Sequence, residues 1–241
     1  MTFTADTHRP SAAYEERRGR LETYFDRTAL DAWTQLTSDA PVSRIRATVR
    51  AGRDSMRETL LSWLPQNMRA ASLFDAGCGA GALAVAAARR GARVTGIDVS
   101  AGLIKLAQER APKDVAPGAV DFGVGDMLDP RFGRFDYVVA MDSLIHYPSA
   151  EILRVLGAFA ARTDRAILFT FAPQTPALSL MHAAGKLFPR ADRAPAIEPV
   201  SEAAIRRAIA ASPALTGWKI GRSTRITSGF YMSHAMELVR A

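Results

Sequence analysis

The segment Phe74-Asp75-Ala76-Gly77-Cys78-Gly79-Ala80-Gly81 decides the fold. An apolar run leads into its glycines, and a helix-forming run from Gly81 to Arg90 follows them. Glycine lets the backbone turn tightly and approach a ligand without a Cβ in the way, and the start of a helix presents unpaired N–H groups. The segment therefore predicts a strand, a cofactor-binding loop and a helix, in that order.

The chain after this loop continues to alternate short strand-like runs with helical ones. Strands are expected at residues 73–75, 93–98, 120–124, 135–141 and 165–171, with helices at about 101–110 and from about 149. Such alternation is typical of a parallel sheet covered by helices. Two further strand-like runs, 218–226 and 230–239, meet at Ser228-Gly229 and predict a hairpin. We therefore expect an α/β fold with a mostly parallel seven-stranded sheet, whose last strand lies antiparallel at or near the edge.

The first 66 residues lack the alternation of strand-like and helical runs that marks the predicted sheet domain at 67–241. Residues 1–10 are polar and aperiodic, and we expect them to be disordered. One helix is expected with an apolar face formed by Leu21, Tyr24, Phe25 and Thr28. A second helix is expected over about 42–64, ended by Pro65, and it carries a row of arginines: Arg46, Arg50, Arg53 and Arg57. That row is either a solvated face or an anion-binding surface. Residues 1–66 are thus predicted to form a helical arm or cap.

A proline-rich insert at 172–200 separates the fifth strand from the hairpin. Within it, apolar residues recur at helical spacing: Ala177, Leu180, Met181, Ala184, Leu187 and Phe188. The insert begins at the carboxyl end of a strand. It therefore either covers a substrate as a lid or packs on the fold as a core helix.

Composition sets limits on location and partners. The formal net charge of +7 and the pI of about 10.1 favour anionic partners, but they do not choose among nucleic acid, a membrane surface and an acidic small molecule. The one cysteine excludes an intrachain disulfide and fits a reducing cytoplasm. We see neither a secretory signal nor an apolar run of the roughly 18 residues that a membrane span needs. We expect a cytoplasmic protein with at most peripheral membrane contact.

Acidic residues after the first three strands identify the cofactor. The glycine pattern alone also satisfies the fingerprint of dinucleotide-binding proteins, and Asp98 at the end of the second strand suits ribose hydroxyls in either case. Asp75, however, stands where a carboxylate pairs with the ammonium of a methionine moiety, usually through water, and a pyrophosphate would not benefit from it. Asp126 and Met127 follow the third strand, where an acid accepts from an adenine amino group and an apolar neighbour packs on the ring. These features favour S-adenosylmethionine over a nicotinamide cofactor. The expected cofactor-binding residues are Asp75, Gly77, Cys78, Gly79, Gly81, Asp98, Val99, Asp126, Met127 and Met141.

His146 and Tyr147 follow the fourth strand, at the edge where ligands of open parallel sheets bind. This position favours a functional role for His146, whereas Tyr147 is equally well explained as a packing residue. Cys78 is interpreted as a small packing residue under the ligand rather than a nucleophile. The four histidines show no metal-ligand spacing, so we expect no resident metal.

The composite pattern over about residues 67–241 resembles the Rossmann-like class I methyltransferases. Further motifs resemble one family closely, the magnesium-protoporphyrin O-methyltransferases of chlorophyll and bacteriochlorophyll synthesis. They are Tyr24-Phe25-Asp26-Arg27-Thr28-Ala29 with Trp33, Leu144-Ile145-His146-Tyr147-Pro148, Thr170-Phe171-Ala172-Pro173-Gln174-Thr175-Pro176 with Lys186-Leu187-Phe188-Pro189, and Phe230-Tyr231-Met232-Ser233. The resemblance covers nearly the whole chain after residue 14.

This resemblance implies methyl transfer from S-adenosylmethionine to one propionate of magnesium protoporphyrin IX, giving the monomethyl ester and S-adenosylhomocysteine. It also suggests Tyr24 and His146 as the catalytic pair, and handover of the porphyrin from the large porphyrin-binding subunit of magnesium chelatase. A carboxylate is ionised near neutral pH, so the site needs to orient it rather than deprotonate it. Three alternatives stay open: a methyltransferase for another small acid, one for RNA, and a non-catalytic porphyrin carrier or chelatase partner. We see no aromatic and basic module for nucleic acid.

Overall fold

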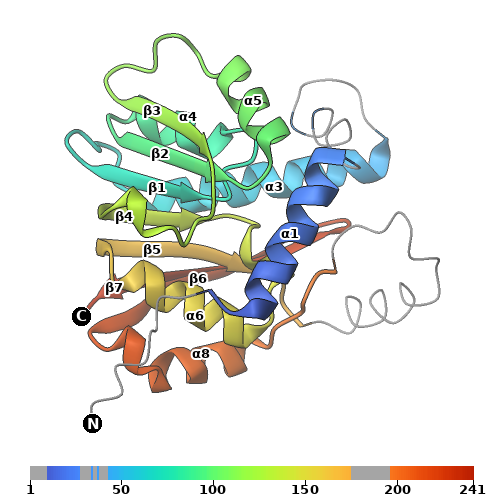
Figure 1. The fold of residues 1–241 in the computed structure, drawn as a ribbon, viewed down its shortest axis with the longest axis vertical. Coiled ribbons are helices and arrows are strands. Elements are labelled where there is room, and N and C mark those ends of the chain that lie inside the picture. The colour runs from blue at the N-terminus through green and yellow to red at the C-terminus, as the bar shows by residue number, and fades with distance from the viewer. Residues whose placement is uncertain (1–9, 28–33, 35–36, 38–42, 175–195) are drawn as a thin grey trace.

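The computed structural model describes residues 10–27, 34, 37, 43–174 and 196–241. The predictions for residues 1–9, for Thr28, Ala29 and Trp33, and for the helical part of the insert from Ala177 to Phe188 lie outside the described residues. Within them, a seven-stranded sheet forms the centre of the molecule, with helices on both faces (Figure 1).

The sheet has the predicted number of strands. Its strands are β1 (Ser72–Ala76), β2 (Arg93–Asp98), β3 (Ala119–Val124), β4 (Phe135–Ala140), β5 (Thr163–Phe171), β6 (Trp218–Ser228) and β7 (Tyr231–Arg240), in the order β3-β2-β1-β4-β5-β7-β6. β1 to β5 are parallel, and β7 runs antiparallel to both β5 and β6. The mostly parallel sheet with an antiparallel last strand is therefore confirmed, with β7 one strand in from the edge.

Helices cover the two faces of the sheet. They are α1 (Ala12–Arg27), α3 (Arg44–Trp63), α4 (Ala82–Arg89), α5 (Ala101–Arg110), α6 (Ser149–Ala160) and α8 (Glu202–Ala211), with short 3-10 turns η1 (Pro130–Phe132), η2 (Leu144–His146) and η3 (Pro213–Leu215). α6 and α8 pack on one face and α3 and α4 on the other. No helix in the described part of the chain combines the length and apolar character that a membrane span requires.

The alternation of side chains along each strand divides the core into two layers. Phe74 of β1 belongs to the layer under α6 and α8, whereas its neighbour Leu73 belongs to the layer under α3 and α4. Met56 and Leu60 of α3 are completely buried in that second layer. α3 is therefore part of the main core and not only an attached arm.

The strand order reverses between β1 and β4, because β2 and β3 lie on one side of β1 while β4 and β5 lie on the other. In open parallel sheets, ligands bind outside the carboxyl ends of the strands at such a reversal. Helix α1 crosses these carboxyl ends (Figure 1). The fold thus brings the glycine loop, the acids and His146 to one edge of the sheet, beside α1.

Candidate active site

The glycine loop needs its glycines. Gly77, Gly79 and Gly81 have φ of 78°, 53° and 78°, values that residues with a Cβ rarely adopt. A Cβ on Gly77 would also come within 2.5 Å of the Ser143 Cβ, so the loop lies directly against the segment that follows β4. Gly81 is the N-cap of α4, as the sequence predicts.

Asp98 holds this loop in place from the end of β2. Its Oδ2 accepts from the Gly79 N–H at 2.9 Å, and its Oδ1 accepts from the Ser100 N–H at 3.0 Å. Burial raises the pKa of the Asp98 carboxyl, while these backbone donors act in the opposite direction. Asp98 and its neighbour Val99 both line the cavity described below.

Asp75 is buried, and its Oδ2 has no hydrogen-bond partner among the described residues. Burial, together with the nearby charge of Asp98, raises the pKa of the Asp75 carboxyl to about 7. A buried, unpaired carboxylate oxygen is costly in free energy. The oxygen is therefore suited to a cationic ligand such as an ammonium group.

Cys78 lies in the same loop and lines the larger of the two cavities described below. Burial raises the pKa of its thiol well above the ordinary value, with the charges of Asp75 and Asp98 adding to the effect. Because the thiolate is the nucleophilic form, a thiol in this environment is unreactive. This fits the interpretation of Cys78 as a packing residue.

Asp126, the acid expected to meet the adenine, is already held by helix α1. Its Oδ1 accepts from the Tyr14 hydroxyl at 2.6 Å and from the Leu128 N–H at 2.8 Å. Its Oδ2 pairs with the Arg18 guanidinium at 3.1 Å. Met127 is buried beside it and lines the cavity. Neither Tyr14 nor Arg18 was predicted, since no local pattern shows which acid a helix contacts more than a hundred residues away.

Asp142 joins the end of β4 to β7 and to α3. It has a φ of 54°, a conformation that is uncommon outside glycine and is often found at functional sites. Its carboxylate accepts from the hydroxyls of Tyr231 at 3.0 Å and Ser233 at 3.1 Å, and it pairs with Arg53 of α3 at 3.1 Å. Arg53 therefore faces the site, so for this residue the solvated-face interpretation of the arginine row is wrong.

His146 closes the turn η2 directly after this segment. Its Nδ1 lies 3.3 Å from the Ala196 carbonyl oxygen, and because a carbonyl only accepts, Nδ1 carries the proton of that hydrogen bond. The ring of Phe25 stands edge-on to the His146 ring, with centroids 6.4 Å apart. Tyr24 is half-buried next to Phe25, and their ring centroids are 5.2 Å apart.

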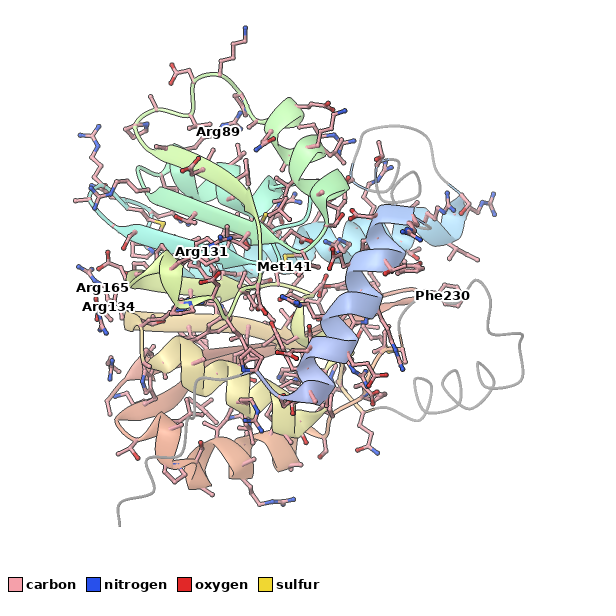
Figure 2. The ribbon with its side chains drawn as sticks, viewed as in Figure 1. Arg89, Arg131, Arg134, Met141, Arg165 and Phe230 are labelled. Atoms are coloured by element: carbon pink, nitrogen blue, oxygen red, sulfur yellow. The ribbon has the colours of Figure 1, made fainter. Side chains whose placement is uncertain are left out.

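Two adjoining cavities bring these parts together. The first has a volume of about 120 Å³ and is lined by Asp98, Val99, Met127, Met141 and His146 together with Tyr14, Leu21 and Phe25 of α1. The second has a volume of about 520 Å³ and is lined by Asp75, Cys78 and Gly81 together with Arg50, Arg53 and Arg57 of α3. Met141 and Gly77 line both, and Figure 2 shows Met141 at the centre of this edge, close to α1. The structure thus brings His146 to the cofactor residues, whereas Tyr24 does not line either cavity.

The part of the chain that the structure describes contains no cluster of three or more His, Cys, Asp or Glu side chains able to hold a metal ion.

Comparison with known proteins identifies the family. The chain is 46% identical over 225 residues to the magnesium-protoporphyrin O-methyltransferase of Rhodobacter capsulatus, an alignment covering 93% of this chain and 97% of that protein. The chain belongs to the magnesium-protoporphyrin O-methyltransferase family. Residues 140–240 match the family described as magnesium-protoporphyrin IX methyltransferase C-terminus, and residues 73–164 match a general methyltransferase domain.

A solved structure of this family supports the fold. The crystal structure of magnesium protoporphyrin IX methyltransferase from Synechocystis PCC 6803 with bound S-adenosylhomocysteine is 30% identical, with a TM-score of 0.79, and the match covers 92% of this chain and 99% of that one. The predicted family, the class I methyltransferase fold and S-adenosylmethionine as cofactor are thereby confirmed.

Sequence reasoning missed four residues that build the site: Tyr14, Arg18, Asp26 and Asp142. Asp26 Oδ1 accepts from the Ser100 hydroxyl and from the Gly102 N–H, so it ties the end of α1 to the start of α5. Asp26 belongs to the motif that carries the family resemblance, and that membership was the only signal in the sequence that could have found it.

Proposed function

We propose that this chain transfers a methyl group from S-adenosylmethionine to a propionate carboxylate of magnesium protoporphyrin IX, giving the monomethyl ester. The observation that carries the proposal is the 46% identity, over nearly the full length of both chains, to a protein of that name. The site agrees with it, because one cavity is lined by His146 together with Asp98, Val99 and Met127 of the predicted cofactor-binding residues.

The reaction needs no proton transfer. A propionate oxygen attacks the methyl carbon, the carbon–sulfur bond breaks, and its electron pair goes to sulfur to give S-adenosylhomocysteine. An anion and a cation thus become two neutral groups, so a site that excludes water favours the reaction, and orientation is the main requirement. The aromatic and aliphatic side chains of Tyr14, Leu21, Phe25 and Ile145 provide the apolar surface for this.

On the cofactor side, Asp98 binds the ribose hydroxyls, Asp126 the adenine amino group, and Asp75 the ammonium group, directly or through one water. The unpaired Oδ2 of Asp75 supports the last assignment. Gly77, Cys78, Gly79 and Gly81 shape the loop, and Val99, Met127 and Met141 supply apolar contacts.

On the acceptor side, Tyr24 and His146 are the catalytic pair that orients the propionate. His146 is supported by its place in the cavity. Tyr24 is supported less directly, by its neighbour Phe25, whose ring lies near the rings of both residues.

Within residues 1–66, helix α1 acts as an arm over this site, and the 172–200 insert acts as its lid. The C-terminal end of the insert supports the second role, because the Glu198 N–H donates to the Ile145 carbonyl at 2.9 Å and Ala196 contacts His146. Arg17 of α1 also contacts the turn η2, at the His146 carbonyl.

The enzyme works in the cytoplasm, receives its porphyrin from the large subunit of magnesium chelatase and touches the inner membrane peripherally. The single cysteine supports a reducing compartment, and the chelatase handover rests on the family resemblance.

The membrane contact is supported by two exposed apolar side chains, Phe230, which is 57% exposed, and Ile45, which is 55% exposed. Figure 2 shows Phe230 at the end of the β6–β7 hairpin, pointing away from the sheet. Phe230→Ser is expected to reduce co-flotation with anionic vesicles, and unchanged flotation would remove this contact.

Mass spectrometry of magnesium protoporphyrin incubated with the protein and S-adenosylmethionine tests the proposed function. We expect a product heavier by one methylene unit, which Asp98→Ala abolishes, and no methylation of RNA or of small carboxylic acids added in the same way. Methylated RNA together with unmodified porphyrin would overturn the proposal.

A further inference from the structure

We propose that Tyr14 is a positioning residue that couples adenine binding at Asp126 to the orientation of the turn carrying His146. The inference rests on the proposed function for the identity of the cofactor and goes beyond it in assigning a role to α1. The contacts that α1 makes with both Asp126 and the turn η2 support it.

The first contact is at the adenine end. Tyr14 is only 1% exposed, and its hydroxyl donates to Asp126 Oδ1 at 2.6 Å. Burial raises the pKa of this phenol far above its ordinary value, with the charges of Tyr147 and Asp126 adding to the effect, so the hydroxyl keeps its proton and remains a donor. A hydrogen bond from a buried donor to a charged acceptor is among the stronger ones in proteins.

The second contact is at the catalytic turn. The Tyr14 ring stacks on Tyr147, which directly follows His146, with centroids 5.2 Å apart and planes inclined by 21°. One turn further along α1, Arg17 donates to the His146 carbonyl oxygen at 2.5 Å and pairs with Glu198 at 2.9 Å. Because Tyr14 and Arg17 are three residues apart on one helix, they lie on the same face of α1.

Asp126 keeps some access to the cofactor, because its side chain is still 13% exposed and its neighbours Gly125 and Met127 line the first cavity. A carboxylate offers about four lone pairs, and three are used, by Tyr14, Leu128 N–H and Arg18. An adenine amino group takes the fourth on the side of Oδ2. The cofactor then fixes the carboxylate to which Tyr14 is bound, and through the Tyr147 stack it fixes the turn η2. Coupling of this kind is reciprocal, so docking of α1 also strengthens cofactor binding.

The test uses Tyr14→Phe, which keeps the ring and removes the hydroxyl. S-adenosylhomocysteine is expected to bind about tenfold more weakly by calorimetry. Turnover of magnesium protoporphyrin at saturating cofactor and acceptor is expected to fall by about tenfold, because the turn is no longer held in place. Arg20→Gln is the matched control, since Arg20 lies on the exposed side of α1 and pairs only with Glu16 among the contacts we observe. We expect wild-type values for it.

Hydrogen exchange separates positioning from a general structural role. In the wild type, S-adenosylhomocysteine should slow amide exchange in α1 and in residues 143–148. In Tyr14→Phe, the same ligand at saturation should no longer protect 143–148. Arg17→Gln removes the contact between α1 and the His146 carbonyl. In this variant the ligand should still protect α1 but should no longer protect 143–148. It provides a second test if Tyr14→Phe folds poorly.

The inference is overturned if the ligand leaves exchange at 143–148 unchanged in the wild type. It is also overturned if Tyr14→Phe loses only affinity, with normal protection and turnover at saturation. Affinity and exchange require no porphyrin, so a chain that shows the coupling but does not methylate the porphyrin would contradict the proposed function alone.

Discussion

Replacing Asp75 by asparagine should stabilise the ligand-free protein and weaken its binding of the cofactor at the same time. Asp75 is buried with an unpaired oxygen, and its carboxyl has a pKa of about 7 against an ordinary value of 3.8. Because the folded pKa is raised, the folded state still holds the proton at pH values where the unfolded state has released it. The stability of the ligand-free protein should therefore fall as pH rises from about 4 to about 7, and then level off.

The size of the effect follows from the pKa difference. About three pKa units at about 1.4 kcal/mol each give a penalty of at most roughly 4 kcal/mol above pH 7. Asp75→Asn carries no charge at any pH, so it should recover part of this penalty, roughly 1 to 4 kcal/mol in the free energy of unfolding. Loss of the pair with the ammonium group should weaken S-adenosylhomocysteine binding by about ten- to a hundredfold at pH 8.

Denaturant unfolding of the ligand-free protein and calorimetry with S-adenosylhomocysteine, both from below to above pH 7, measure the two effects. Wild-type affinity should rise by about ten- to a hundredfold in total as pH rises to above about 7, because the ligand binds the ionised carboxylate better than the protonated carboxyl. Asp75→Asn should lack this dependence. Asp121→Asn, the same change on the exposed side of β3, is the control and should leave both quantities unchanged. An Asp75→Asn protein that is less stable and binds the ligand as tightly as the wild type would refute the reasoning.

Three further predictions concern the catalytic pair and the loop. His146→Ala should lower turnover by about a hundredfold, because the propionate is no longer oriented, while S-adenosylhomocysteine affinity, measured by calorimetry, changes little. An equal loss of both would make His146 a structural residue. Tyr24→Phe should slow turnover while circular dichroism shows unchanged helix content, and unchanged kinetics would remove Tyr24 from the mechanism. Gly77→Ala should destabilise the protein in thermal unfolding by about 1–3 kcal/mol and impair cofactor binding, because its φ is positive and the new Cβ meets Ser143, so wild-type stability would contradict the loop geometry.

Most of the fold could be predicted from the sequence because its signals are local. The strands at the centre of the sheet are short apolar runs, and the predicted ends agree with the structure to within about two residues. The glycine loop at 77, 79 and 81 could also be predicted locally, because each of these positions has a positive φ, which glycine adopts readily. The acids at 75, 98 and 126 could be placed because each lies at or just after the carboxyl end of a strand.

The residues that complete the site could not be predicted, because their roles depend on contacts between distant parts of the chain. Tyr14 and Asp126 are 112 residues apart, and nothing near Tyr14 indicates its partner. Asp142 follows a predicted strand, but its left-handed backbone and its partners on β7 and α3 become visible only in the folded protein. Arg53 belongs to a row of four arginines at helical spacing, and the sequence does not indicate which of them pairs with an acidic residue of the site.

The transfer of an isotope-labelled methyl group from S-adenosylmethionine to magnesium protoporphyrin tests the central claim most directly. Nuclear magnetic resonance of the product should show the label as a propionate methyl ester, released as methanol by alkaline hydrolysis, and His146→Ala should greatly slow its appearance. A label found on a ring carbon or nitrogen, or no label in the porphyrin at all, would contradict the account.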